Sequence, residues 1–243
     1  MKKSTRFTVQ RLHGRRGSAR QEGATMVEFA IVCPFALLVV LGIIQMGLMF
    51  TAKEVVNEAT FLAARAGAVQ HAQVQKMTAV MTKALVPFYQ DTTNTNDISR
   101  LGAAFLKAEG DAAFITVEVL NPTPAAFQDF GLPPNSASQN HTYIPNDNLE
   151  FRPHTVRGSN SNQSIQDANA LKIKVIYGYE IKVPLMQSVI KSVMCGFDTG
   201  VEAFGRGTST AIVGGDDCRN YYNKGRIPIV AYATVQMQTP AWE

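Results

Sequence analysis

The sequence predicts an α+β protein, in which a long N-terminal membrane-spanning helix extends into a small domain of helices packed on a short, mainly antiparallel sheet. Three observations lead to this prediction. The first 23 residues are strongly basic, residues 29–50 form an uncharged apolar run, and the second half of the chain contains segments that alternate between apolar and polar residues. A run of that length can span a bilayer, and period-two alternation is typical of strands.

The positive charge of the chain is concentrated at its N-terminus. Of 23 Lys and Arg residues, seven precede residue 24 together with one acid, Glu22, which leaves 16 bases and 18 acids in the remainder. A protein that neutralises nucleic-acid phosphates keeps its bases on the folded body. The charges therefore argue against nucleic acid as a partner. The positive-inside rule places residues 1–23 in the cytoplasm and the C-terminal part outside.

The apolar run, Phe29–Phe50, contains no charge, and Gln45 is its one strongly polar residue. At ~1.5 Å per residue the run spans ~33 Å, enough for the hydrocarbon core of a bilayer and longer than a secretory signal peptide requires. Pro34 and Gly42 are tolerated in a membrane helix. We divide the chain into a basic leader (1–23), a transmembrane helix (24–50), a helical extension (51–87) and a periplasmic α+β domain (88–243).

The helical extension carries a stripe of small residues, Ala59, Ala63 and Gly67, at every fourth position. Small residues at this spacing let helices approach closely. Two alternatives stay open, since the stripe can pack on helices of other subunits or on the protein's own domain. The helix is expected to continue to residue 86, with a bend near Gly67, and to end before Pro87.

The periplasmic domain is expected to contain about three strands and two helices. The strands are predicted at 114–120, 171–183 and 227–237, and the helices at 98–108 and 184–194. Residues 121–170 are rich in Pro, Asn, Ser and Gln and are interpreted as an irregular insertion with little core of its own. This insertion could serve adhesion or partner contact, or it could be a simple surface excursion.

Three cysteines divide between two environments. Cys33 lies in the apolar run and is expected to act as a small hydrophobe. Cys195 and Cys218 both fall on the outer side, where disulfides persist. A bridge between them would close a loop of about 24 residues and stabilise the fold by ~3 kcal/mol; the alternative is two unpaired buried thiols.

No pattern in the sequence predicts catalysis. The four histidines, at 13, 71, 141 and 154, have no metal-ligand spacing, and there is no nucleophile elbow or phosphate-binding glycine loop. The prediction is therefore a protein that is not an enzyme, with no metal, no cofactor and no small-molecule substrate.

The start of the apolar run carries one carboxylate, Glu28. Gly23, then four residues, then Glu28, followed by the aromatic Phe29 and the early Pro34, resembles the TadE-like family of pseudopilins from tight-adherence (Flp-type) pilus systems. The segment Ala64–Gly67 is similar to the end of the family's small-residue extension. Residues 171–186 and 226–240 resemble the second conserved region of its longer members more weakly.

The resemblance implies a minor pilin-like protein of the bacterial inner membrane that is required to assemble Flp pili. It implies that a prepilin peptidase cuts between Gly23 and Ala24, and that Glu28 and Phe29 serve recognition and assembly. The Glu28 carboxylate would then pair with the free amine of Ala24 on a neighbouring subunit. Expected partners are the peptidase, other pilin-like subunits and the pilus assembly platform.

Two other interpretations remain open. The chain could be an uncleaved single-pass protein with a periplasmic binding or adhesive domain, belonging to another secretion system. In that case Glu28 would be an ordinary acidic residue that flanks the membrane. A membrane-tethered enzyme is the third class, and it would require convergent polar groups in the outer domain.

Overall fold

The computed structural model describes residues 24–91, 93, 95–135, 138–195 and 215–243. Two compact units divide the chain at residue 40, and each is described by itself. Residues 24–40 are the first part of helix α1 (Ala24–Val69), which contains Pro34 without interruption. Every side chain described from residue 26 to residue 40 is exposed. This exposure of an apolar helix is what a surrounding lipid phase requires.

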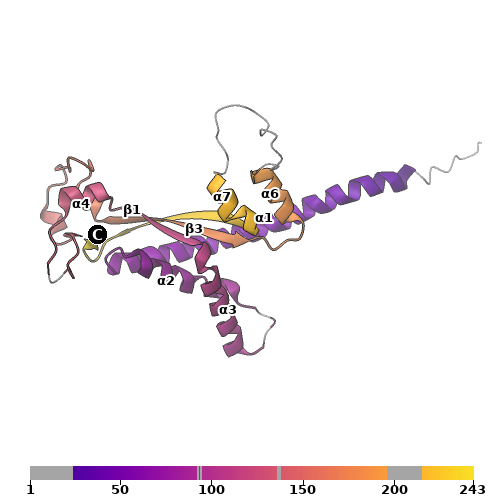
Figure 1. Ribbon diagram of the computed structural model, residues 1–243, viewed down its shortest axis with the longest axis horizontal. Helices are drawn as coiled ribbons and strands as arrows, with labels where there is room; N and C mark the ends of the chain where they lie inside the picture. The colour runs from indigo at the N-terminus through magenta and orange to yellow at the C-terminus, as the bar shows by residue number, and fades with distance from the viewer. Residues whose placement is uncertain (1–23, 92, 94, 136–137, 196–214) are drawn as a thin grey trace, which may run out of the picture. The chain divides into compact units, whose positions relative to one another are not determined.

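The rest of the described chain forms an α+β domain around the second part of α1 (Figure 1). From residue 45 onward one face of α1 is buried, with the buried residues three or four positions apart. They are Gln45, Ala52, Val56, Ala59, Thr60, Ala63, Ala64 and Ala68. Most are alanines, so the sheet can pack close to the helix backbone. The mixed α+β class predicted from the sequence is confirmed.

Helix α1 ends at Val69, so the prediction of one helix continuing to residue 86 is wrong. The chain turns through residues 70–73 and continues as α2 (Val74–Ala84) and the 3₁₀ helix η1 (Val86–Tyr89). His71 and Ala72 adopt left-handed φ values of 58° and 59°, which cost about 1–2 kcal/mol each. Contacts from the far end of the chain stabilise this turn.

Those contacts satisfy the free carbonyls at the end of α1. The Ala68 carbonyl accepts hydrogen bonds from the amides of Gln238 (2.9 Å) and Thr239 (3.1 Å). The His71 ring stacks on Trp242, with ring centroids 3.6 Å apart. Since these partners lie about 170 positions away, local sequence gave no sign that the helix would end here.

A three-stranded antiparallel sheet packs against α1, in the order β1–β3–β4. Its strands are β1 (Ile115–Asn121), β3 (Ala170–Glu180) and β4 (Arg226–Gln236). In the central strand Val175 lies opposite Val117 on one side and Ala231 on the other. Alternate residues of β3, from Leu171 to Tyr179, are buried in the core with α1 and α2. The three predicted strands are confirmed, with β3 as one strand that continues through Gly178.

The remaining helices flank this sheet. They are α3 (Asp97–Asp111), η2 (Ala112–Phe114), α6 (Met186–Cys195), α7 (Gly215–Asn220) and η4 (Tyr222–Lys224). Asn96 caps α3 by accepting from the amides of Ile98 and Ser99, which satisfies two donors at the helix start. The helices predicted at 98–108 and 184–194 are both present, although Pro184 lies in the turn before α6 and not in its first turn.

Residues 121–170, interpreted as an irregular insertion with little core of its own, contain short helices and a strand, and some of their side chains pack into the main core. They form α4 (Pro124–Phe130), β2 (Tyr143–Ile144), η3 (Leu149–Phe151) and α5 (Ile165–Ala168), and β2 pairs with β5 (Ala241–Trp242). Phe127, Ile144 and Ala168 are buried in the main core. Asp129 holds the following loop by accepting from the Ser161 amide and hydroxyl, both at 2.7 Å. A few apolar residues are enough to anchor this segment, because they pack on side chains from distant parts of the chain in the main core.

Candidate functional site

The N-terminal end of α1 carries the residues that the sequence singles out. Gly23 lies outside the described residues, and Ala24 is the first residue of α1. Glu28 and Phe29 follow in the second turn, where Glu28 is exposed and Phe29 is 71% exposed. Among the residues that the structure describes, nothing forms an ion pair or hydrogen bond with the Glu28 carboxylate. Within the described part of the chain, the Glu28 carboxylate is therefore exposed and makes no polar contact.

An unpaired carboxylate at this position has a definite electrostatic preference. It lies just past the first turn of the helix, where the macrodipole still slightly favours an anion. Carrying an acid to the centre of a bilayer costs on the order of 2.5–3.5 kcal/mol. A cation that pairs with Glu28 near the helix start would remove much of that cost. The roles of Gly23, Ala24, Glu28 and Phe29 remain predictions.

Helix α1 fits a single-pass membrane protein. Within the described parts of the chain it is the one helix that is long and apolar enough to cross a bilayer. Most of its large apolar side chains between Met26 (78%) and Phe50 (69%) are exposed, and Leu41 and Met49 are half-buried. Cys33 is a free, exposed cysteine in this segment, as expected for a small apolar side chain that faces lipid.

The outer end of the apolar run meets the domain at Gln45. This side chain is 2% exposed, and its Oε1 accepts a hydrogen bond from the Val183 amide at 3.2 Å. The sequence identifies Gln45 only as the one strongly polar residue of the run. Its hydrogen bond with the Val183 amide was not predicted. A single amide in an otherwise apolar segment was the available signal, because such a group needs a hydrogen-bond partner.

The small-residue stripe packs on the protein's own domain, the second of the two alternatives. Ala59 and Ala63 are at most 1% exposed. A Cβ atom on Gly67 would lie 2.4 Å from the Met77 Sδ and 2.9 Å from the Leu171 Cδ2. The lack of a side chain at Gly67 thus lets α2 and β3 meet at this point of α1.

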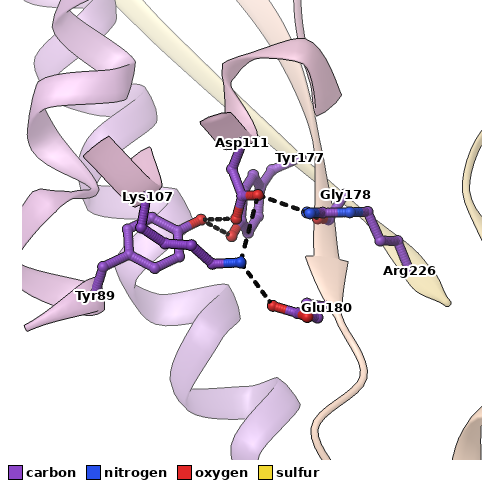
Figure 2. A network of polar contacts seen from close by, with 7 residues as sticks. All are labelled: Tyr89, Lys107, Asp111, Tyr177, Gly178, Glu180 and Arg226. Carbon is purple, nitrogen blue, oxygen red and sulfur yellow. Dashed lines mark hydrogen bonds and ion pairs between the residues drawn. The ribbon is translucent and has the colours of Figure 1, made fainter. Parts of the chain in front are cut away.

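A buried polar network joins α3 to the sheet (Figure 2). The Arg226 Nη2 donates to the Asp111 Oδ1 at 2.7 Å, and its Nη1 donates to the Gly178 carbonyl at 2.7 Å. The Tyr89 hydroxyl donates to the Asp111 Oδ2 at 2.6 Å and contacts the Tyr177 hydroxyl. Asp111 and Arg226 are 4% and 8% exposed. The network therefore ties η1, α3, β3 and β4 together.

The pKa values of Asp111, Tyr89 and Tyr177 are all shifted further from neutral pH. Burial acts to raise the pKa of Asp111, but hydrogen bonds from Arg226 and Tyr89 outweigh it and lower that pKa. Burial raises the pKa of Tyr177 to about 12 and also raises that of Tyr89, where the neighbouring Tyr177 and Asp111 add to the effect. Near neutral pH the carboxylate is ionised and both phenols are neutral. Such a network supports packing and provides no group for proton transfer at that pH.

The two outer cysteines are joined by a disulfide. Cys195, the last residue of α6, bonds to Cys218 of α7, with Cα atoms 5.8 Å apart. No group of three or more His, Cys, Asp or Glu side chains among the described residues could hold a metal ion. His71 and His141 both stack on Trp242, which gives these two histidines a packing role.

The TadE-like protein family matches residues 23–65. The match begins at Gly23 and includes Glu28, Phe29 and Pro34, the residues on which the sequence resemblance depends, and that resemblance is confirmed. No curated protein and no solved structure shows significant similarity to the chain.

Proposed function

We propose that this chain is a minor pilin-like protein of the bacterial inner membrane that is required to assemble tight-adherence (Flp) pili. The observation that carries the proposal is the agreement between the TadE-like match at residues 23–65 and the state of α1. That helix presents an exposed Glu28, with no partner among the described residues, at the start of a long apolar segment whose side chains are mostly exposed. A helix of this kind can be held in a membrane and passed to neighbouring helices in a fibre.

Cleavage between Gly23 and Ala24 is part of this proposal. It would remove the seven bases and one acid of the leader, a net charge of +6, and create a free amine at Ala24. Glu28 lies four positions after Ala24, so in a neighbouring subunit the two groups can pair when the helices are offset along their axes. Pairing would neutralise the one acid of the apolar helix, which is otherwise costly in lipid.

The domain has a structural role in the proposal. The buried side chains of Asp111 and Arg226 are paired with each other, and the small residues Ala59 and Ala63 of α1 are buried in the domain's own core. The chain therefore offers the first half of α1 and the domain surface to partners. We place the N-terminus in the cytoplasm and the domain in the periplasm because the basic leader precedes the helix, and we propose no enzymatic activity.

Processing is tested on the protein purified from its own host, with and without the prepilin peptidase. Intact mass and N-terminal sequencing are expected to give Ala24 as the first residue only when the peptidase is present. Residues 1–23 still attached in both strains would refute the processing step. That result would favour the alternative of an uncleaved, membrane-anchored binding or adhesive protein.

Assembly is tested with Glu28→Ala and with Glu58→Ala as the matched control. Both glutamates are exposed on α1, but Glu58 lies beyond the apolar run. Glu28→Ala is expected to insert into the membrane normally and to abolish pili, whereas Glu58→Ala should leave them unchanged. Equal numbers of pili in the two variants would remove the assembly role from Glu28.

A further inference from the structure

The segment that precedes α6 contacts the outer end of the apolar helix at Val183. The Val183 amide bonds to the Gln45 side chain at 3.2 Å, and Val183 is itself buried. Several apolar side chains of α1 near Gln45 are exposed, namely Ile44 (49%), Met46 (53%) and Leu48 (39%). Val183 thus contacts one side of α1 at a level where neighbouring side chains of the helix remain exposed.

The position of Gln45 along the run sets the level of that contact. A hydrocarbon core of ~30 Å takes about 20 helical residues at ~1.5 Å each. Counted from Phe29, the first residue after the last charge, the core would end near Leu48. Gln45 lies about three residues, or ~4.5 Å, before that point, and tilt would place it somewhat deeper, because a tilted helix needs more residues to cross the core. Residues bonded to Gln45 are therefore within about one helical turn of the boundary between acyl chains and headgroups.

An exposed apolar stripe follows directly on this contact. Leu185, Val189 and Val193 are spaced four residues apart, and the Val189 amide donates to the Leu185 carbonyl at 3.3 Å. We call these three residues the α6 stripe. Leu185 is 65% exposed and Val193 is 75% exposed, while Val189 is half-buried. Leu185 also has a left-handed φ of 67°, which is an unfavourable backbone conformation for a leucine. Its side chain is exposed in this conformation.

The charges of this segment complement a phospholipid surface. Residues 181–195 contain Lys182 and Lys191 and no acid. Lys191 is exposed on α6, and Lys182 lies over the Phe88 ring with its Nζ 5.4 Å from the ring centroid. An amphipathic helix with exposed apolar residues and lysines is typical of segments that lie in the membrane interface. The disulfide from Cys195 to Cys218 holds the end of α6 to α7.

We infer that residues 181–195 form a second membrane contact of this protein, in which the α6 stripe enters the outer edge of the hydrocarbon and Lys191 meets lipid phosphates. The inference rests on the membrane span of α1, which is part of the proposed function, and it does not depend on pilus assembly. Its physical consequence is that the domain is held against the bilayer surface by two elements, so rotation about α1 is restricted.

The experiment uses the full chain with Cys33→Ser, in vesicles of phosphatidylethanolamine and phosphatidylglycerol. A single cysteine labelled with an environment-sensitive fluorophore is introduced by Val193→Cys, with Phe151→Cys as the matched control and Ile43→Cys as the reference for the span. Phe151 is 86% exposed and Ile43 is 67% exposed. The Cys195–Cys218 bond is kept oxidised throughout. Lipids with brominated acyl chains quench probes within the membrane, and iodide quenches probes in water.

Quenching by bromolipid at both Ile43→Cys and Val193→Cys, together with quenching by iodide at Phe151→Cys, is the expected result. Bromolipid quenching at Ile43→Cys alone, with Val193→Cys open to iodide, would overturn the inference and leave the span intact. No bromolipid quenching at Ile43→Cys would refute the span and the inference with it. If Val193→Cys becomes protected only when other pilin-like subunits are added, the stripe is a protein contact, and the inference is also overturned.

Discussion

Replacing Asp111 by alanine would leave Arg226 buried without its ionic partner. The two side chains are 5% and 10% exposed and lie 2.7 Å apart. Breaking a buried pair by removing one partner typically costs 3–5 kcal/mol. Arg226 keeps the Gly178 carbonyl and the face of the Phe114 ring, 3.8 Å from its guanidinium carbon. We therefore expect the lower end of that range, about 3 kcal/mol, for the loss in free energy of unfolding.

The measurement is urea unfolding of the full chain in detergent micelles, followed by near-ultraviolet circular dichroism. Asp97→Ala is the control on the same helix, because the Asp97 side chain is 84% exposed and pairs with Arg100 at 3.0 Å. An exposed pair of this kind contributes below about 1 kcal/mol. If Asp111→Ala costs no more than Asp97→Ala, the network does not stabilise the domain in the way that its geometry indicates.

The apolar replacement Arg226→Met provides a second check on the same reasoning. Combined with Asp111→Ala it removes both charges, and a pair replaced by apolar side chains is often near neutral in stability. The double variant should therefore be more stable than Asp111→Ala alone. If the two losses simply add, no coupling exists between the residues.

Three further predictions concern stability of the full chain in detergent. Gly67→Val should lower the free energy of unfolding by about 1–3 kcal/mol, because the valine side chain would overlap neighbours in the core. A Cβ on Gly102 meets nothing within 4 Å, so Gly102→Ala should stabilise α3 by up to about 1 kcal/mol. Thermal melting of the two variants tests both expectations. Hydrogen bonds from Ser161 lower the pKa of Asp129 from 3.8 to about 2, so its contribution is present above pH 3.8 and is lost as the pH falls towards 2; the stability difference from Asp129→Asn should shrink in that window. Reducing the disulfide opens a loop with a sequence separation of 23 residues and should lower the free energy of unfolding by ~3 kcal/mol; a Cys195→Ser variant that melts like the oxidised protein would contradict this.

The elements predicted correctly are those with local signals. The strand at 115–121 and the helix at 97–111 follow from period-two and helical patterns that each segment carries alone. The end of α1 had no such signal, because Val69 is followed by residues that suit a helix. Its termination depends on Gln238, Thr239 and Trp242, which supply the hydrogen bonds and the stacking that stabilise the turn.

Residues 121–170 show that local sequence also failed to predict which side chains are buried in the core. Composition indicated that residues 121–170 would stay on the surface, yet Phe127 and Ile144 are buried. Burial is a property of what packs on a side chain, and the partners of β2 come from β5 at the far end of the chain. For Gln45 the sequence showed a polar residue in an apolar run, while its partner, the Val183 amide, became visible only in the fold.

The sequence by itself determined the long apolar helix, the basic charge of residues 1–23, the strands and the residues that match TadE-like proteins, because length, charge and periodicity are properties of contiguous residues. The tertiary structure decided where α1 ends, which face of it the domain covers, and that Ala59, Ala63 and Gly67 serve the protein's own core. It also brought together the Asp111 network, whose members come from four separate elements. Each of these depends on contacts between residues far apart in the chain, and only the folded arrangement selects among the partners that the sequence allows.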